Sequence, residues 1–349
     1  MGNIKFDHFE DTFEVLNPLI GFKSDVQRVE VRRDPLSGRT SVYNPLIETR
    51  SKMFVADADF ALLRQLAEES AAHCFFCPNN IDKVARFPAE LVPQGTVRRG
   101  ETVLFPNLFA LAKYHAVAAV SHSHFLELHQ FTPGLIADAF LAMHELVTCI
   151  YRQDTAPLCA TVNANYLFPA GASLMHPHFQ LLLTLLPYTE QANLLEGCRD
   201  YFAEHGSAYH PDLVRIEKAE GERYIAQTGA WHWLAAYSPL GSNEILGIHE
   251  QCGDFGRLTD ADLTALAEGL SAALRVYESL GYLSFNFTLY SRREPESPDG
   301  FNCLIRCMTR QNPYPNYRTD DFFLQKGLQT EVILTLPEKL AAQARPFFA

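Results

Sequence analysis

The stretch AGASLMHPHFQ, residues 170–180, decides how this chain of 349 residues is interpreted. Alternate residues of a β-strand point to the same face, so a strand here would place His176, His178 and Gln180 on one face. The Gly-Ala-Ser lead-in lets backbone N–H groups and a hydroxyl approach an anion. A neutral imidazole beside such a pocket is a suitable nucleophile for phosphorus. Two hydrogen-bonded core histidines are the alternative, but the lead-in and Gln180 together favour a functional site.

The composition is that of an ordinary globular protein, with 47% hydrophobic and 20% charged residues. The length allows two domains or one large duplicated domain. A net charge of −12 argues against a surface for nucleic acid. The sequence starts without the basic residues and apolar run of a signal peptide, and its apolar stretches are broken short of a membrane span. We therefore expect a cytoplasmic protein without nucleic-acid or membrane partners.

Of the eight cysteines, only Cys74 and Cys77 have a spacing that indicates a mechanism. Two thiolates on a tight turn form a chelating pair, which is half of a zinc site. A thioredoxin-like redox pair is the alternative, but the Pro-Asn-Asn after Cys77 does not open an obvious helix. We expect the other cysteines to be buried thiols, because a disulfide framework is unusual in a chain of this length without a secretion signal.

The hydrophobic pattern predicts one order of elements twice: two strands, a helix and two further strands. In the first half these are two β-like runs within residues 102–120, a helix over 133–152, and strands over 161–165 and 174–186. In the second half they are strands over 231–237 and 243–249, a helix over 260–280, and strands over 283–290 and 301–308. Further predicted elements are a hairpin over 29–43 and helices over 60–73, 191–204 and 338–345.

The motif Gly-Ala-Ser-x-x-His-Pro-His-x-Gln at residues 171–180 resembles the active-site signature of the galactose-1-phosphate uridylyltransferase family, a branch of the histidine-triad superfamily. The resemblance covers nearly the whole chain and implies an α+β fold. Two histidine-triad-like halves, residues 1–190 with the zinc and active sites and residues 191–349, would pack into one antiparallel sheet with flanking helices. It also implies a homodimer as the candidate assembly.

The resemblance further implies a nucleotidyltransferase of galactose metabolism, of the UDP-glucose–hexose-1-phosphate uridylyltransferase type. Such an enzyme moves a nucleoside monophosphate from a nucleoside diphosphate sugar to a phosphorylated small-molecule acceptor, a sugar 1-phosphate. The second His of the family motif is the nucleophile, so His178 would carry a nucleotidyl-histidine intermediate. Gln180 would hydrogen-bond the phosphoryl oxygens. Because histidine-triad hydrolases usually have a third His there, Gln180 favours transfer over hydrolysis.

A closed, structural Zn²⁺ site is also implied, in which His176 joins the cysteine pair and a histidine from a further segment. The family places that last ligand at the tenth position of a stretch that begins His-x-Val. Counted from His115, the tenth position is His124, and His122 is the reserve candidate. The implied ligand set is Cys74, Cys77, His124 and His176.

Substrate contacts are implied by further matches to the family. The segment Phe-Pro-Asn at residues 105–107 matches one whose Asn contacts uridine, and other matched residues lie near the phosphates. Turn or strand-end capping is the alternative role for the two asparagines. For Arg50, which follows the predicted hairpin, the alternative role is a charge on a loop that contacts only solvent. The implied substrate-binding residues are Asn107, Asn165, Gly171, Ser173 and Arg50.

The chain also departs from the family pattern. A second metal site found in some members would need ligands at Leu194, residues 291–293 and residues 305–308, and is predicted to be absent. Residues 323–327 do not reproduce the aromatic–Glu pair that contacts the hexose, and Leu108 stands where an acidic residue is common. The acceptor therefore need not be galactose 1-phosphate.

Two alternative functions follow. One is a nucleoside diphosphate sugar or dinucleoside polyphosphate phosphorylase of the same superfamily, with inorganic phosphate as the acceptor. The other is a nucleotide- or metal-binding protein without catalytic activity, against which the intact His-Pro-His-x-Gln motif argues.

Overall fold

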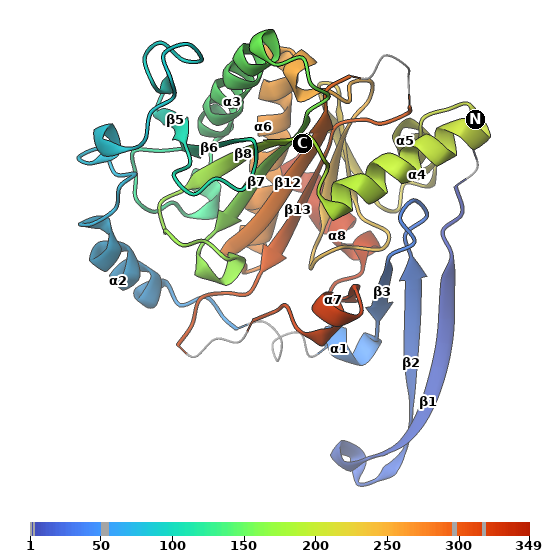
Figure 1. Cartoon of the computed structure of the whole chain (residues 1–349). Helices are drawn as coiled ribbons and strands as arrows, with labels where there is room; N and C mark the ends of the chain where they lie inside the picture. Colours follow the sequence, from blue (N-terminus) through green and yellow to red (C-terminus); the bar gives the residue numbers. More distant parts are fainter. Residues whose placement is uncertain (1, 3, 50–55, 295–298, 316–318) are drawn as a thin grey trace.

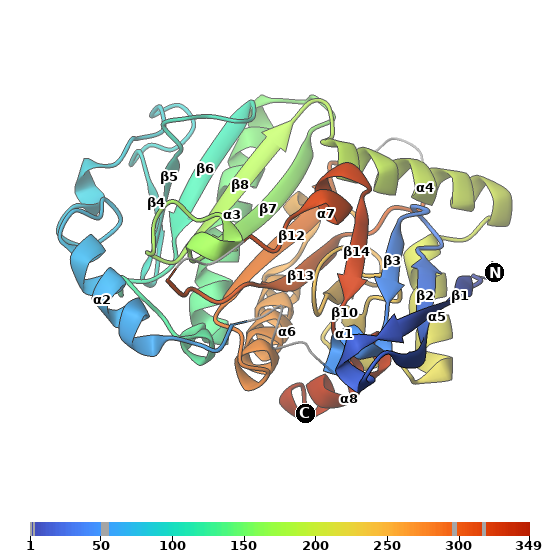
Figure 2. The ribbon, with the colours of Figure 1, turned by 90° about the horizontal axis from the view of Figure 1, so that it is seen from below.

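A ten-stranded antiparallel sheet forms the centre of the molecule (Figures 1 and 2). The structure is a computed structural model that describes residues 2, 4–49, 56–294, 299–315 and 319–349. The strand order is β4-β5-β6-β8-β7-β12-β13-β11-β10-β9. In chain order the strands are β4 (Val97–Arg99), β5 (Thr102–Pro106), β6 (Tyr114–Ala119), β7 (Cys159–Tyr166), β8 (His178–Thr184), β9 (Tyr224–Thr228), β10 (Trp231–Ala235), β11 (Ile245–His249), β12 (Ser284–Arg292) and β13 (Leu304–Arg310).

The sheet is built from two copies of one unit. From one edge the order is β4-β5-β6-β8-β7, and from the other it is β9-β10-β11-β13-β12, so the two halves meet at the β7–β12 pair. One helix, α3 (Pro133–Gln153) or α6 (Asp260–Ser279), follows the third strand of each unit. The α+β fold with duplicated halves is therefore confirmed. The boundary at residue 190 stays a prediction, and one hydrophobic core extends through both halves.

Helices α3 and α6 lie side by side on one face of the sheet (Figure 1). Each begins at a threonine cap: Thr132 accepts from the Leu135 N–H, and Thr259 forms a capping box with Asp262. Helix α3 alone among the described helices is long and apolar enough to cross a membrane, although the sequence led us to expect shorter apolar stretches. Its apolar side is buried against the sheet, which is the position of a core helix.

The opposite face is covered differently in the two halves. In the second half, α4 (Thr189–His205) and α5 (Tyr209–Glu220) pack over it with a separate apolar cluster. In the first half, the loop after α2 (Phe60–Ala71) packs Phe76 and Ile81 against Phe105 and Val117. Helix α5 was not predicted, whereas α2, α3, α4, α6 and α8 (Pro337–Ala344) match predicted helices to within a few residues.

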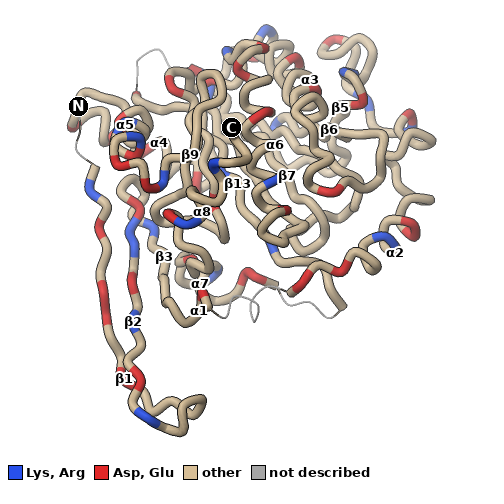
Figure 3. Tube along the Cα trace, turned by 180° about the vertical axis from the view of Figure 1, so that it is seen from behind, with Lys and Arg blue, Asp and Glu red and all other residues tan. Residues whose placement is uncertain are grey.

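A smaller four-stranded sheet, with order β1-β2-β3-β14, lies beside the large one. Its strands are β1 (His8–Asn17), β2 (Lys23–Arg33), β3 (Thr40–Tyr43) and β14 (Thr330–Ile333), and the short helices α1 (Pro45–Thr49) and α7 (Phe323–Gly327) lie next to it. The β2–β3 pair is the predicted hairpin. The longer β1–β2 hairpin was not predicted, and it projects from the body with charges of both signs along it (Figures 1 and 3).

Strand β8 begins later than predicted. It starts at His178 rather than at residue 174, so His176 lies in the approach to the strand. The physical reason is Pro177, which has no N–H to give to the ladder. Its carbonyl still accepts from the Val120 N–H at 3.0 Å, which keeps this approach extended beside the end of β6.

Candidate functional site

The first residues of β8 place His178 and Gln180 on the face of the sheet that α3 and α6 do not cover. Between them, Phe179 points to the helix side, where its ring lies 6.1 Å from that of Phe140 and 4.8 Å from that of Phe287. Because side chains alternate along a strand, His178 and Gln180 face the other way. The predicted common face therefore holds for these two residues.

The His178 ring is fixed in one tautomer. Its Nδ1–H donates to the backbone carbonyl of His176 at 2.8 Å, so in the neutral ring the lone pair is on Nε2. The side chain is 7% exposed, and burial lowers its pKa below the ordinary value of 6.5. At neutral pH the ring is therefore uncharged and can act as a nucleophile through Nε2.

The loop that leads to His178 has an unusual backbone. Leu167 has a φ of 65°, which costs a residue with a side chain about 1–3 kcal/mol. Gly171 has a φ of 89° and ends the short turn Phe168–Ala170. Ser173, further along, is exposed. Strain in a loop next to a buried imidazole is typical of a site where a ligand contacts the backbone.

This loop is held by residues of the second half that sequence reasoning missed. Asn286 of β12 donates from Nδ2 to Asn165 Oδ1 at 2.7 Å and to the Ala170 carbonyl at 2.9 Å. Arg310 of β13 in turn donates to Asn286 Oδ1 at 2.6 Å and is paired with Asp320. Asn165 is thus part of the support of the loop, and the two halves of the sheet are both needed to shape it.

Of the other predicted substrate-binding residues, Asn107 lies apart from this loop, and Arg50 is not among the residues that the structure describes. Asn107, after β5, accepts from the Phe109 N–H through Oδ1, which is the turn capping considered as its alternative role. Its Nδ2 also lies 3.1 Å from His115 Nε2, and His115 contacts Gln180, so Asn107 is close to the site. Arg50 lies outside the described residues.

A second cluster brings together Cys74, Cys77, His124 and His176, whose ligand atoms all lie within 4.8 Å of one another. The cysteines are on the turn after α2, where the Phe76 N–H donates to Cys74 Sγ. Cys77 Sγ lies 3.3 Å from His124 Nδ1 and 3.6 Å from His176 Nδ1. The reserve candidate His122 is exposed beside Glu101 and is not part of this group.

The chemistry of the four donors fits a metal ion. Both histidines are held by their outer nitrogens: His176 Nε2 lies 2.8 Å from the Ser121 carbonyl, and His124 Nε2 lies 2.9 Å from Ser70 Oγ. This leaves Nδ1 of each ring for a metal. Burial lowers the pKa of His176 to about 4 and raises that of Cys77 to about 11, and a cation among the donors would favour a neutral ring and a thiolate.

The cluster and His178 are directly connected. The His176 side chain belongs to the cluster, while its backbone carbonyl accepts from His178. Phe76, between the two cysteines, also contacts the rings of His176 and His178 edge-on, with centroids 6.1 and 5.4 Å away. Whatever fixes the four donors therefore also fixes the direction of His178 Nε2.

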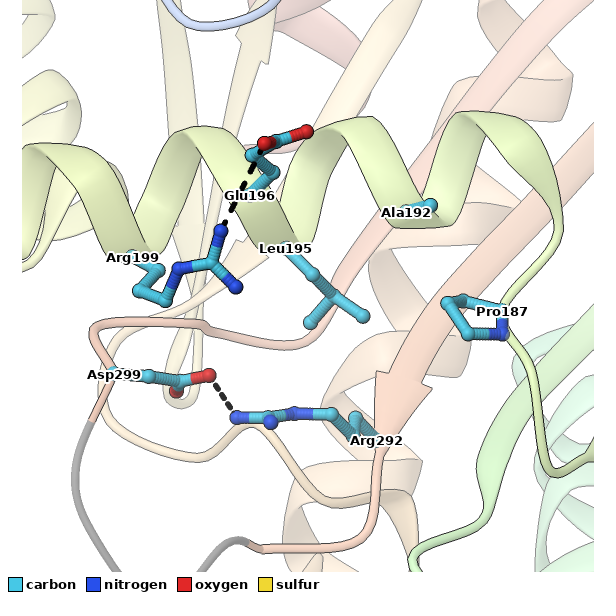
Figure 4. Close-up of a pocket in the computed structure, with 7 residues that line it drawn as sticks. All are labelled: Pro187, Ala192, Leu195, Glu196, Arg199, Arg292 and Asp299. Atoms are coloured by element: carbon cyan, nitrogen blue, oxygen red, sulfur yellow. Dashed lines mark hydrogen bonds and ion pairs between the residues drawn. The ribbon is translucent and has the colours of Figure 1, made fainter.

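The region of the predicted missing metal site has a different character. A cavity of about 460 Å³ beside α4 is lined by Leu195, Glu196 and Arg199, and by Arg292, which is paired with Asp299 (Figure 4). The neighbouring Leu194 is buried in the apolar cluster of the second half. The absence of a second metal site stays a prediction, and among the described residues an arginine stands where a ligand would be needed.

Comparisons with known proteins find relatives of this chain both by sequence and by structure, although no family model matches it. An uncharacterized protein of Archaeoglobus fulgidus is 30% identical over 343 residues, which is 98% of this chain and 99% of that protein.

Solved structures show the same fold. An ADP-glucose phosphorylase from Arabidopsis thaliana with bound ADP-glucose is 20% identical, with a TM-score of 0.66 over 91% of this chain and 98% of that one. A uridylyltransferase mutant is 17% identical, with a TM-score of 0.64 over 91% and 98%. By sequence the chain belongs to one family with the uncharacterized protein from Archaeoglobus fulgidus, and it shares its fold with the solved ADP-glucose phosphorylase and uridylyltransferase.

Proposed function

We propose that this protein is an enzyme that transfers a nucleoside monophosphate from a nucleoside diphosphate sugar to a phosphorylated acceptor, through a covalent intermediate on His178. The observation that carries the proposal is the His178 ring itself: it is buried, its Nδ1–H is bound to the His176 carbonyl, and its Nε2 lone pair is available. Solved relatives in fold, a uridylyltransferase and an ADP-glucose phosphorylase, act on nucleotide substrates and support this class.

The first step forms one bond and breaks one bond. The lone pair of His178 Nε2 attacks the α-phosphorus, the bond from that phosphorus to the bridging oxygen breaks, and sugar 1-phosphate leaves with the electron pair. In the second step, an acceptor phosphate oxygen attacks the same phosphorus and the electrons return to Nε2. The His178 ring carries positive charge in between, and its hydrogen bond to the His176 carbonyl stabilises that charge by about 1.5–3 kcal/mol.

A candidate region for binding a sugar lies next to Arg310 and Asp320, the ion pair that holds Asn286. A cavity of about 350 Å³ beside α7 is lined by Thr309, Gln325 and Glu331. Burial raises the pKa of Glu331 to about 7, so near neutral pH this side chain can both donate to and accept from a hydroxyl. Polar groups of this kind suit the hydroxyls of a sugar, which supports a sugar-containing substrate.

Phosphorolysis is the second candidate. The departures at Leu108 and at residues 323–327, the latter forming α7 beside this cavity, favour an acceptor other than galactose 1-phosphate. Inorganic phosphate could discharge the same intermediate on His178 by the same bond changes.

Zn²⁺ is the metal that we propose for the four-donor cluster. Two thiolates and two imidazoles form the tetrahedral donor set of structural zinc sites. A bound ion would fix the loop that carries His176, and through the His176 carbonyl it would keep His178 aligned. None of the eight cysteines, which all lie within the described residues, forms a disulfide. Cysteines without disulfides are usual in a reducing compartment, and this supports our proposal that the protein is located in the cytoplasm.

We propose a homodimer in which a second copy of the chain covers the β1–β2 hairpin. One face of this hairpin carries Phe9, Phe13 and Val15, and Phe22 is exposed at its tip. Burying one phenylalanine is worth about 1.5–3 kcal/mol. Two copies of the hairpin contribute six phenylalanines, three from each chain, and burying them can therefore offset an association cost of roughly 4–15 kcal/mol. A symmetric pair would use both arms in the same way.

The transfer proposal predicts a mass increase of one nucleoside monophosphate when the protein is incubated with the correct donor. UDP-glucose, ADP-glucose and GDP-sugars are tested separately by intact-mass spectrometry, and the adduct is then discharged with hexose 1-phosphate or inorganic phosphate to identify the acceptor.

We expect His178→Ala to lose the adduct and to lower turnover by about 10³-fold or more. The control His129→Ala changes an exposed surface residue and should keep both the adduct and the turnover. An adduct in His178→Ala would disprove the nucleophile, and nucleotide binding without any adduct or turnover would favour a binding protein.

The metal proposal predicts one zinc ion per chain in protein from zinc-supplemented cells, measured by inductively coupled plasma mass spectrometry. Cys77→Ser should lose the ion because it removes a thiolate from the cluster. Cys149→Ser changes a thiol of α3 outside the cluster and should keep it. Metal-free wild-type protein, or full zinc in Cys77→Ser, would contradict the assignment.

The dimer proposal predicts a mass of twice 39.3 kDa in light scattering after size exclusion. Phe13→Glu replaces an exposed ring on the face that carries Phe9 and Phe13 with a charge and should give monomers. Thr12→Glu adds the same charge to the opposite face and should leave the dimer intact. Monomeric wild-type protein, or a dimeric Phe13→Glu variant, would rule out this interface.

A further inference from the structure

His115 of β6 and Gln180 of β8 form a diagonal pair across neighbouring strands. Gln180 lies opposite Val117, and His115 is two residues before Val117, so both side chains are on the same face. His115 Nε2 lies 2.9 Å from Gln180 Oε1. In the sequence, His115 served only as the first position of the stretch in which His124 was identified as a candidate ligand. Nothing in the sequence indicated the contact with Gln180, because this contact depends on the register between two strands far apart in the chain.

The surroundings of His115 determine which nitrogen carries the proton. Its Nδ1 accepts from the Leu111 N–H at 3.1 Å, so a neutral ring has its proton on Nε2 and donates to Gln180 Oε1. Burial lowers the pKa of His115, which keeps the ring neutral near pH 7. Asn107 Nδ2 also lies close to Nε2, but both groups are donors, so this contact adds no hydrogen bond.

The orientation of the Gln180 amide follows from this hydrogen bond. With Oε1 held by His115, the –NH₂ group of Gln180 points away from His115 and is available as a donor. Without His115, the amide could rotate and present its oxygen, which would repel the anionic oxygens of a phosphoryl group. We propose that His115 is a positioning residue, which holds the Gln180 carbonyl oxygen so that the Gln180 N–H groups donate to the phosphoryl oxygens of the nucleotide transferred to His178. This inference rests on the proposed function.

The second half of the protein has the same diagonal pair with different chemistry. In β13, Arg306 lies opposite Leu246 of β11, and Glu244 is two residues before Leu246. Arg306 Nη1 donates to Glu244 Oε1 at 2.7 Å, and both side chains are buried. The corresponding positions in the two units therefore each hold a diagonal pair in which a hydrogen bond from one side chain fixes the orientation of the other. In the second half this pair is a buried ion pair, and in the first half it is a neutral pair that leaves one amide group available.

The test compares two variants that differ by one methylene. In His115→Gln, the side-chain amide N–H can reach the position of the His Nε2–H, whereas in His115→Asn the amide is too short. We measure the single-turnover rate of adduct formation on His178 and the dissociation constant of the nucleotide donor. We expect His115→Gln to stay near the wild-type rate and His115→Asn to be about 10- to 100-fold slower with little change in the dissociation constant. Tyr114→Phe, which changes the next residue on β6 and its contact with Asp154, is the control for strand integrity.

A double-mutant cycle with Gln180→Ala completes the test. If His115 acts through Gln180, the double variant His115→Asn/Gln180→Ala should be no slower than Gln180→Ala alone. Losses that multiply, or a wild-type rate in His115→Asn, would overturn the inference while leaving the adduct and the proposed function in place. Wild-type protein that forms no adduct with any donor would instead overturn the proposed function, and this inference with it.

Discussion

The hydrogen bond from His178 Nδ1–H to the His176 carbonyl is the contact on which the site depends. It makes Nε2 the free nitrogen, and it connects the proposed nucleophile to a residue whose own side chain lies among Cys74, Cys77 and His124. Two residues along the chain, through Pro177, therefore separate a group of four potential metal ligands from the ring of the proposed nucleophile. A structural ion in that cluster would act on the chemistry only by holding the backbone, which explains why the donors can be closed to water.

The duplicated fold explains why the proposed site around His178 has no counterpart at the corresponding strand of the second unit, among the residues that the structure describes. Both units place the same strands in the same order, but α4 and α5 cover the second unit on the face where the first unit carries His178. The strand positions of Gln180 and Arg306 correspond, and only the first leaves a group available for a ligand. The second unit contributes support instead, since Asn286 and Arg310 hold the loop before His178.

Local patterns in the sequence predicted the helices α2, α3, α4 and α6, the cysteine pair, and the repeated order of elements except for the first strand of each unit, β4 and β9. The resemblance to a known family, not a local pattern, added His124 and His176 to the cysteine pair, and the structure brings the four donors together. Three features could not be predicted in this way. Strand β8 starts at His178 because Pro177 cannot donate to the ladder. The contacts of His115 with Gln180 and of Asn286 with Asn165 depend on the register of strands distant in sequence. The β1–β2 hairpin alternates too weakly in hydrophobicity to be recognised as a pair.

The measurement that most directly tests the role of His178 is the identity of the ring nitrogen that carries the nucleotide. ³¹P NMR of the trapped adduct, in protein labelled with ¹⁵N-histidine, reports which nitrogen is bonded to phosphorus. We predict a single phosphorus–nitrogen bond at His178 Nε2, because Nδ1 is occupied by its hydrogen bond to the His176 carbonyl. A phosphorus bond to Nδ1, or to a histidine other than His178, would contradict the mechanism.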